Sequence, residues 1–432
     1  MKTLKITRAA NANLQNKINT SVVFNYLRKN EPTYRARISR GLKISAPAVS
    51  RIVDKLIADG YVVETEKLKI QSGKRPTQLQ INSDKCNVIG VDLVKEKIKI
   101  ALSDFRGKII STRQGCSITE ATDIGAKLIK EIEDMLACHA LERDAPERNS
   151  LERNIEAQTN NLKAICVGIP AVIDIDTGYV TDAPLYASLR DLNLKEILGG
   201  HFDVPIYVEN VVKLSALGEK HYGEGADYKD IVFIEVSNGI GAGIIIDNHL
   251  IRGTHGSAGE IGLYVTGRED LRYNVQNKGC LEKNASVEAI VEKTLKAVEN
   301  GGRTLVSERI NGESNSLTPS AVCRAAIEGD RIANEIISEI VENLSLVTIN
   351  LILILNPQII VFGGEICNLP GVKTLFIDPI RETVAASIPF EIPQVKISSL
   401  GENAGVIGAS FLAIESLLLG EFPYTIDLNV LT

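Results

Sequence analysis

At residues 231–243 the chain reads IVFIEVSNGIGAG, in which an apolar run is followed by a turn of small residues. The run Ile231–Val236 is short and rich in β-branched residues, so it predicts a buried strand. The turn contains Gly239, Gly241 and Gly243, and such turns bring backbone N–H groups close to a phosphate or another ligand. Tight hairpins use the same glycines, so the turn alone does not identify a ligand.

The sequence on both sides of this stretch predicts an α/β body. Upstream, three short strands are expected at 88–93, 97–102 and 108–111, and Arg106-Gly107 forms the turn into the third. Downstream, the most apolar segment is 344–362, but asparagines and a proline interrupt it. It therefore predicts a buried helix followed by a strand rather than a membrane span. Between these regions a helix is expected, with one apolar face made by Ile124, Leu128, Ile129, Ile132, Met135 and Leu136.

The first 85 residues predict a different, smaller module. Helical spacing of apolar residues indicates helices at 12–29, 34–41 and 46–59, and strands are expected at 61–65 and 77–81. Three helices followed by a two-stranded hairpin are the elements of a winged helix-turn-helix. The residues expected to cap the helices are Thr33 and Ser45 at the N-termini, and Gly41 and Gly60 at the C-termini.

The third helix and the hairpin tip are the expected DNA contacts of this module. Small and basic residues lie off the apolar stripe of the third helix, which allows close approach to base edges in the major groove. The tip reads QSGKRP at 71–76, and its basic residues suit the minor groove or the phosphates. A module that contacts only other proteins is the alternative. The expected contact residues are Arg35, Ser45, Ala48, Ser50, Arg51, Lys55, Lys74 and Arg75.

The charge distribution favours a nucleic-acid partner for this module alone. Residues 1–85 hold 17 Lys and Arg against 6 Asp and Glu, a net charge of +11. Because the whole chain carries −6, the remaining residues carry −17. The acidic body would repel DNA, so contact is expected only within the first 85 residues. The alternative is that these charges form a solvated basic surface that binds no partner.

The order of motifs in the body resembles the ROK family, a group of bacterial sugar kinases and sugar-responsive transcriptional repressors. The resemblance implies an actin/hexokinase-like α/β fold with two lobes, and the N-terminal module resembles that of the family's repressors. The matching motifs are Gly168-Ile169-Pro170, Glu209-Asn210, Asn238–Gly243, Gly259–Gly262, Gly279–Glu282, Asn356-Pro357, Gly363-Gly364 and Gly405–Ala409.

Two departures from the family pattern argue against kinase chemistry. Family kinases have an Asp-x-Gly-Gly-Thr phosphate turn, whereas residues 92–96 here read DLVKE, without the glycines and with an acid that repels phosphate. Family kinases also have Glu-Asn-Asp, whose Asp takes the proton from the sugar hydroxyl. Here Val211 occupies that position and cannot accept a proton. No catalytic residue and no cofactor are therefore expected.

The zinc site of many family members is also degraded. The family's zinc-binding His is replaced by Leu263, and two of its three Cys are replaced by Tyr273 and Val275. Only Cys280 remains, and one thiolate cannot make a tetrahedral site. No bound metal is expected, Cys280 is predicted to be a small core residue, and the side chains at 263 and 273 are expected to fill the vacated space by apolar packing.

Three polar residues survive of the family's sugar pocket: Asn210, Glu260 and Glu282. In the resembling family, residues at these positions hydrogen-bond sugar hydroxyls, a task that suits amides and carboxylates. Ordinary surface or loop-capping acids are the alternative reading for the two glutamates. Because the Asp and His partners are missing, the ligand can be a pentose, a cyclic polyol or a modified sugar.

The sequence therefore predicts a repressor of carbohydrate-utilisation genes that a small sugar-like effector releases from double-stranded DNA. Residues 1–85 would bind DNA, and 86–432 would bind the effector and form a homodimer or homotetramer. The lobes are expected at about 86–207, with the C-terminal helix, and at about 208–400. Seven scattered cysteines without a CxxC pair, no targeting segment and no membrane span indicate a reducing cytoplasm.

Two other functions remain open at this stage. One is a sugar kinase with a fused DNA-binding module, which the changes at 92–96 and 211 disfavour. The other is a repressor that acts without a small ligand or responds to a protein partner, which the altered pocket allows.

Overall fold

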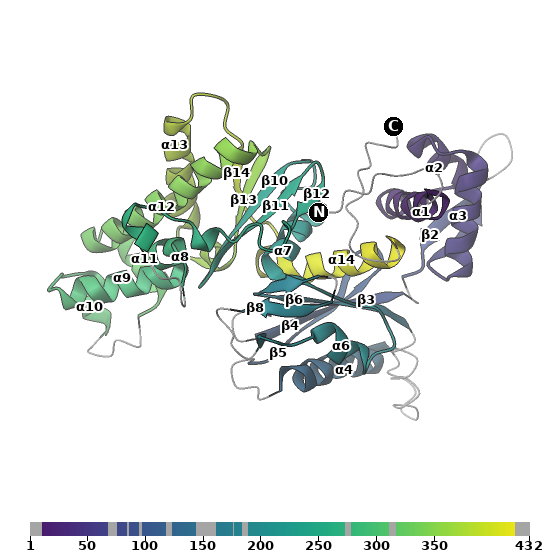
Figure 1. Cartoon of the computed structure of the whole chain (residues 1–432), viewed down its shortest axis with the longest axis horizontal. Helices are drawn as coiled ribbons and strands as arrows, with labels where there is room; N and C mark the ends of the chain where they lie inside the picture. Colours follow the sequence, from purple (N-terminus) through teal and green to yellow (C-terminus); the bar gives the residue numbers. More distant parts are fainter. Residues whose placement is uncertain are drawn as a thin grey trace.

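The computed structural model describes residues 11–67, 76–83, 86–94, 97–117, 123–143, 161–175, 177–183, 189–272, 278–310 and 317–419. Figure 1 shows three parts: helices α1–α3 on one side, a sheet carrying α4 and α6, and a second sheet with a group of helices beyond it. The hairpin tip with Lys74 and Arg75 lies outside the described residues, as does most of the polar stretch 142–161.

The N-terminal module has three helices and a two-stranded antiparallel ribbon, as the sequence predicted. Its helices are α1 (Asn11–Asn30), α2 (Arg35–Leu42) and α3 (Ala46–Ala58), and its strands are β1 (Val62–Lys67) and β2 (Thr77–Ile81). The apolar face of α3 is buried, as expected, through Val49, Ile52, Val53 and Leu56.

The ends of these helices differ from the expected caps. Thr33 does not cap α2, because it is buried and its backbone pairs with Leu79 of β2 through hydrogen bonds of 3.2 and 2.7 Å. Lys43, rather than Gly41, takes the left-handed conformation after α2. A Cβ at Gly41 would lie 2.4 Å from the Tyr26 hydroxyl, so this glycine serves the contact with α1. Ser45 stands at the N-cap of α3, but its hydroxyl makes no capping bond.

The first sheet of the body has the order β5-β4-β3-β6-β9. Three antiparallel strands come first, and two strands parallel to β3 extend the sheet. Helices α4 (Ile124–Arg143) and α6 (Leu194–Gly199) bury its outer face with the apolar residues predicted for α4. The strands are β3 (Asn87–Val94), β4 (Lys97–Asp104), β5 (Ile109–Ser117), β6 (Leu162–Ile169) and β9 (Ile206–Asn210), with a small hairpin, β7 (Val172–Asp174) and β8 (Tyr179–Asp182), beside them.

The second sheet repeats the same plan in the order β12-β11-β10-β13-β14. An antiparallel meander again comes first, and two parallel strands follow β10. The predicted strand at 231–236 is its central strand, β10. The strands are β10 (Ile231–Val236), β11 (Ile240–Ile246), β12 (His249–Ile251), β13 (Ile359–Gly363) and β14 (Gln394–Ile397). Two sheets with one shared plan are the architecture of the actin/hexokinase-like class.

The helices on the outer side of this sheet form the largest core cluster. The apolar segment 344–362 is a buried helix followed by a strand, as predicted, because α12 ends at Leu355, Asn356 after it is left-handed, and β13 begins at Ile359. Among the described helices, α12 alone is long and apolar enough to cross a membrane. In its most apolar stretch, however, 56% is buried inside this lobe. The helices are α8 (Cys280–Ala285), α9 (Val287–Glu299), α10 (Leu305–Ile310), α11 (Pro319–Ile327), α12 (Arg331–Leu355) and α13 (Asp378–Ser387).

Short 3₁₀ and π segments complete the described chain. They are η2 (Ile261–Leu263), η3 (Glu269–Arg272), η5 (Glu365–Asn368), η6 (Lys373–Ile377) and η7 (Gly401–Asn403).

Helices α7 (Val211–Tyr222) and α14 (Ala404–Leu419) join the two sheets. α14 packs against β3 and β6 of the first sheet, and α7 packs against β10 and β11 of the second. Figure 1 shows α14, in yellow, crossing between the sheets beside α7. The two helix backbones touch, because a Cβ at Gly408 would lie 1.8 Å from the Leu214 carbonyl oxygen and one at Gly218 would lie 2.4 Å from that of Ala404.

Candidate functional site

Asn210 lies where β9 ends and α7 begins, and its side chain caps that helix. Its Oδ1 accepts hydrogen bonds from the backbone N–H groups of Val212 at 2.9 Å and Lys213 at 3.2 Å. Its Nδ2 donates to the Ala171 carbonyl at 3.1 Å. An amide oxygen has two lone pairs, so both acceptor positions of Asn210 are used by the protein itself. Only an N–H of this side chain is left for a ligand.

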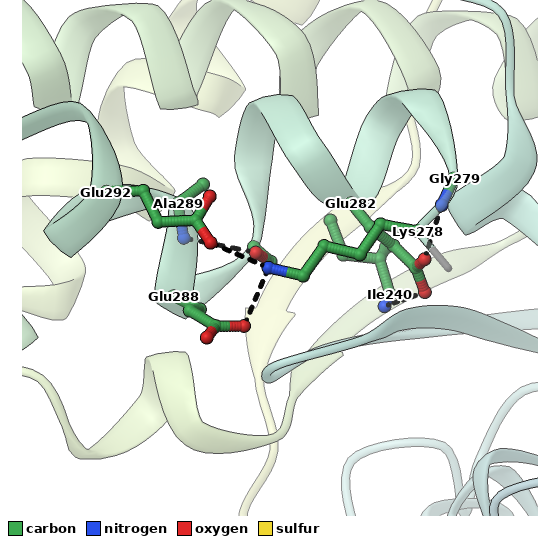
Figure 2. Close-up of polar contacts among 8 residues, drawn as sticks. Ile240, Lys278, Gly279, Glu282, Glu288, Ala289 and Glu292 are labelled. Atoms are coloured by element: carbon green, nitrogen blue, oxygen red, sulfur yellow. Dashed lines mark hydrogen bonds and ion pairs between the residues drawn. The ribbon is translucent and has the colours of Figure 1, made fainter. Parts of the chain in front are cut away.

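Glu282 stands in the first turn of α8 and is also bonded to backbone. Its Oε2 accepts from the Gly279 N–H at 2.8 Å and its Oε1 from the Ile240 N–H at 3.1 Å. Figure 2 shows this carboxylate reaching both amides, with Lys278 beside it bridging Glu288 and Glu292 of α9. Glu282 therefore joins the start of α8 to the start of β11, and it keeps two acceptor positions for other partners.

Glu260, half-buried before η2, is the third predicted ligand residue. Within the described part of the chain its carboxyl makes no hydrogen bond. Burial raises the pKa of this carboxyl, the Lys213 ammonium lowers it, and Glu282 raises it. Glu260 follows Gly256, to which Lys213 of α7 donates, and precedes Gly262, where a Cβ would lie 2.6 Å from Glu282 Oε1 of α8, so the structure brings the three predicted ligand residues into one region. Within the described residues Glu260 uses none of its acceptor positions, whereas backbone N–H groups occupy both of those of Asn210 and two of the four of Glu282.

A buried lysine that the sequence analysis missed lies in the same region. Lys213 is 2% exposed, and its ammonium donates to the Gly256 carbonyl at 2.6 Å. Burial lowers the pKa of Lys213, while the carboxylates of Glu209 and Glu260 raise it. An ammonium has three donors, and one is used by Gly256. The sequence signal was a lysine in the buried first turn of α7, among valines and leucines.

A buried ion pair supports this cluster. Arg252 Nε lies 2.6 Å from Glu209 Oε2, and Glu209 Oε1 accepts the N–H of Asn210 at 2.9 Å. The pair links β9 of the first sheet to the loop that follows β12 of the second. Breaking a buried pair leaves a charge uncompensated, so Arg252 holds Glu209 and its neighbour Asn210 in place.

Val211 and Asp92, which carry the two departures from the kinase pattern, both lie against the start of α14. A Cβ at Gly405 would lie 2.0 Å from Asp92 Oδ2 and 3.3 Å from Val211 Cγ2. Asp92 is buried, and burial followed by the nearby Glu235 raises its pKa well above the ordinary value. Among the described residues, Asp92 Oδ1 has no hydrogen-bond partner. Lys95 and Glu96 of the altered phosphate turn lie outside those residues.

The structure around Leu263 and Cys280 differs from the expectation at one residue. Cys280 is 2% exposed and is a core residue, as predicted. Leu263, however, is 49% exposed, so the expectation that it fills the vacated space is wrong. The neighbouring Gly262 is a residue of η2 that packs inward, since a Cβ there would meet Glu282 Oε1 and the Ile240 carbonyl oxygen at 2.6 Å. Tyr273 and Val275 are not described, and in the described ranges no three His, Cys, Asp or Glu side chains form a metal-binding group.

The predicted DNA contacts on α3 lie on its outer side. Ser45, Arg51 and Lys55 are exposed, and Ala48 and Ser50 are half-buried. Together they form a surface that is separate from the buried stripe of the helix.

Arg35 has a second role that the sequence did not indicate. Its guanidinium lies 2.8 Å from Asp54 of α3 and 2.6 Å from Glu64 of β1, so it ties α2 to both elements. Exposed pairs of this kind contribute about 0.2–1 kcal/mol each, so a phosphate can compete with them.

A plot of the logarithm of the binding constant against the logarithm of the salt concentration has a negative slope. We expect Arg35→Ala to make this slope shallower by about 1, because one phosphate contact is lost. Asp54→Ala is the matched control, since it breaks one of the same ion pairs but removes no positive charge. Fluorescence anisotropy of labelled duplex DNA over a salt series measures both slopes. Equal slopes for the two variants would mean that Arg35 acts only within the module.

Comparisons with known proteins agree on one family. A model of the ROK family matches residues 88–416. The xylose repressor of Caldicellulosiruptor bescii is 31% identical, over 96% of this chain and 99% of its own length. A solved ROK family transcriptional regulator, described as a homologue of the Escherichia coli MLC protein, has a TM-score of 0.78 at 24% identity and covers 94% of this chain and 97% of its own.

A kinase structure matches a smaller part. A ROK family glucokinase from Streptomyces griseus, solved with glucose and AMPPNP, has a TM-score of 0.59 at 25% identity. The match covers 99% of the glucokinase but 76% of this chain, so about a quarter of this chain has no counterpart in it. The two structural matches confirm the expected actin/hexokinase-like fold.

Proposed function

Since the chain belongs to the ROK family, we propose that it is a DNA-binding transcriptional repressor of carbohydrate-utilisation genes, released by a small sugar-like effector. The observation that carries this proposal is the resemblance of the whole chain, module and body together, to a xylose repressor. A family kinase, by contrast, accounts for the fold of only part of the chain.

The module supports the DNA-binding part of the proposal. Its third helix presents Arg51 and Lys55 to solvent, and small residues at its N-terminal end permit close approach to bases. The net charge of +11 on residues 1–85 supplies the attraction to phosphates. Lys74 and Arg75 at the hairpin tip would add backbone or minor-groove contacts.

The polar cluster around Glu260 supports the effector part. Among the described residues, the Glu260 carboxyl makes no hydrogen bond and the Lys213 ammonium uses one of its three donors, and the two groups lie near each other. Vicinal hydroxyls of a sugar both donate and accept, so they suit such a pair. Because its relative is named a xylose repressor, D-xylose is the first effector to test.

The protein acts without kinase activity in this proposal. The position of the family's general base is a buried valine, and residues 92–96 lack the glycines that cradle phosphate. A sugar kinase is the second candidate. Asp92 lies near Val211, since both contact Gly405, and its carboxylate is the group that would act as general base in place of the missing Asp.

Assembly and location complete the proposal. Repressors of this type read two half-sites as two-fold dimers, so we propose a homodimer or homotetramer built through residues 86–432. With its apolar helix α12 mostly buried in the core, the protein would work in the cytoplasm and not in a membrane.

The test begins with full-length protein and DNA from the region upstream of its own gene, followed by selection from a random duplex pool. Specific binding that D-xylose, glucose or N-acetylglucosamine weakens would support the proposal. The same preparation is assayed for sugar-dependent formation of ADP, the product of phosphoryl transfer from ATP to the sugar, and no turnover is expected. Turnover without sequence-specific DNA binding would establish the kinase instead. Specific binding that none of a panel of sugars and polyols weakens would establish a repressor without a small effector.

A further inference from the structure

Two helices reach from the candidate effector site to the DNA-binding module. α7 begins at the Asn210 cap and carries Lys213 in its first turn. At its other end, the Tyr222 hydroxyl accepts a hydrogen bond of 2.6 Å from Arg28 of α1. With twelve residues, this helix spans about 18 Å between the two places.

α14 makes a second connection beside it. Its first turn contains Gly405, which lies against Asp92 and Val211. Near its other end, Glu415 accepts hydrogen bonds from Asn25 at 2.5 Å and Ser21 at 3.2 Å, both on α1. In Figure 1 this helix extends from between the sheets toward the N-terminal module.

Helices α7 and α14 pack closely against each other. The contacts of Gly218 and Gly408 leave no room even for a methyl group between the backbones. Packed interiors of this density shift between discrete arrangements rather than deform continuously. A displacement of the first turn of α7 would therefore be carried to the far ends of both helices.

The contact with the module is suited to detect such a displacement. The Arg28 guanidinium lies 5.3 Å from the centre of the Phe411 ring and 5.6 Å from that of Tyr222. His221 stacks on Phe411, and burial followed by the charge of Arg28 holds the His221 pKa well below its ordinary value, so this imidazole adds no positive charge beside Arg28. Buried polar contacts lose much of their energy when their geometry is disturbed.

A further contact holds the module to the body through the turn between β4 and β5, where a Cβ at Gly107 would lie 1.9 Å from the Tyr222 hydroxyl of α7. Arg106, in the turn between β4 and β5, forms an ion pair with Glu31. Next to it, Phe105 packs against Phe24 and Tyr61 of the module, with ring centres 6.0 and 5.3 Å apart. This contact attaches the module to the first sheet in addition to the contacts that α7 and α14 make with α1.

We propose that α7 and α14 form one rigid element that transmits effector binding at Lys213 and Glu260 to the module through Arg28, Tyr222 and Glu415. This inference deepens the proposed function and rests on it. An effector that draws the Lys213 ammonium away from the Gly256 carbonyl shifts the first turn of α7. The shift changes the angle of α1, and with it the spacing of the two α3 helices in a dimer.

The test compares Tyr222→Phe and Glu415→Gln with Arg106→Ala. Tyr222→Phe removes the hydroxyl that accepts from Arg28, and Glu415→Gln removes the negative charge from the group that accepts from Asn25 and Ser21; both keep the shape of the side chain. Arg106→Ala is the matched control, because it removes a contact of the module with the first sheet. Each full-length variant is measured for operator affinity with and without saturating D-xylose, and for D-xylose affinity in the absence of DNA.

For the wild type and the control we expect D-xylose to weaken operator binding by roughly 5- to 150-fold. For Tyr222→Phe and Glu415→Gln this factor should fall below about 3-fold, with D-xylose affinity unchanged. Equal factors in all variants, or an equal loss in the control, would overturn the inference.

A second readout needs no effector. Hydrogen exchange is followed at the first turns of α7 and α14 with and without the selected operator. Because coupling is reciprocal, operator binding should change exchange at these turns in the wild type and the control, but not in Tyr222→Phe. Unchanged exchange in the DNA-bound wild type would overturn the inference while leaving the repressor function intact. Failure of the wild type to bind any DNA specifically would overturn both.

Discussion

Arg51→Ala is expected to weaken binding to the selected operator by about 1–3 kcal/mol, or roughly 5- to 150-fold, if the guanidinium reads a base edge. Arg51 is exposed in the first half of α3, on the side opposite the buried Val49, Ile52 and Val53. An arginine at this place can donate two hydrogen bonds to one guanine, and no other base offers that pair of acceptors. The loss should therefore be large for the operator and small for random DNA.

The measurement is fluorescence anisotropy at one salt concentration, with operator and random duplexes in parallel. Arg331→Ala is the control, since it removes an exposed arginine on α12, far from the module, whose only described partner is Glu335 one turn away. Lys55→Ala should weaken operator and random DNA more evenly, as expected for a phosphate contact. Wild-type affinity in a variant lacking both Arg51 and Lys55 would exclude α3 as the reading helix.

The fold could be predicted because its signals are local and repeated. The strand at 231–236, the buried helix before Asn356 and the apolar stripe of α3 each follow from spacing within one element. The helix ends were predicted less well, because they depend on partners distant in sequence. Thr33 is held by Leu79, and Gly41 is needed by Tyr26, and neither partner is visible from the cap motif itself.

The partners of the side chains in the candidate site were also not predictable from the sequence. The family motifs identified Asn210 and Glu282, but a motif does not tell whether an oxygen faces a ligand or the backbone of its own protein. In the structure both side chains hold backbone amides, which is the capping role that the sequence left open for Glu282. Lys213 was missed because a lysine in a helix is usually a surface residue. Its burial, which marks it as a candidate ligand residue, is visible only in the structure.

These placements change which variant tests the effector site best. Glu282→Gln would leave one of the N–H groups of Gly279 and Ile240 facing an amide NH₂, so it would disturb α8 whether or not a ligand binds. Glu260 holds no described backbone group, so its substitution separates ligand binding from folding. Glu288→Gln on α9 is a matched control, because it makes the same chemical change at an exposed site.

Glu260→Gln is expected to weaken D-xylose binding roughly 10- to 150-fold, since hydrogen bonds to a charged group contribute about 1.5–3 kcal/mol. Operator affinity without sugar should stay at the wild-type value, so the variant represses but no longer responds at the same sugar concentration. Titration calorimetry measures the first quantity and anisotropy the second. If Glu260→Gln and wild type are induced equally by the sugar that proves active, the effector does not use this carboxyl.

The pH dependence gives the same hypothesis a second, independent check. Burial raises the pKa of the Glu260 carboxyl, so the group takes up a proton at a higher pH than an exposed glutamate does. A sugar that is bound by the carboxylate should therefore bind more weakly as the pH falls through this raised pKa, while the module still binds DNA. Glu260→Gln has no proton to gain, so its weak binding should not vary over that pH range. A wild-type affinity for the sugar that stays constant through the same titration would place the bound hydroxyls on other groups.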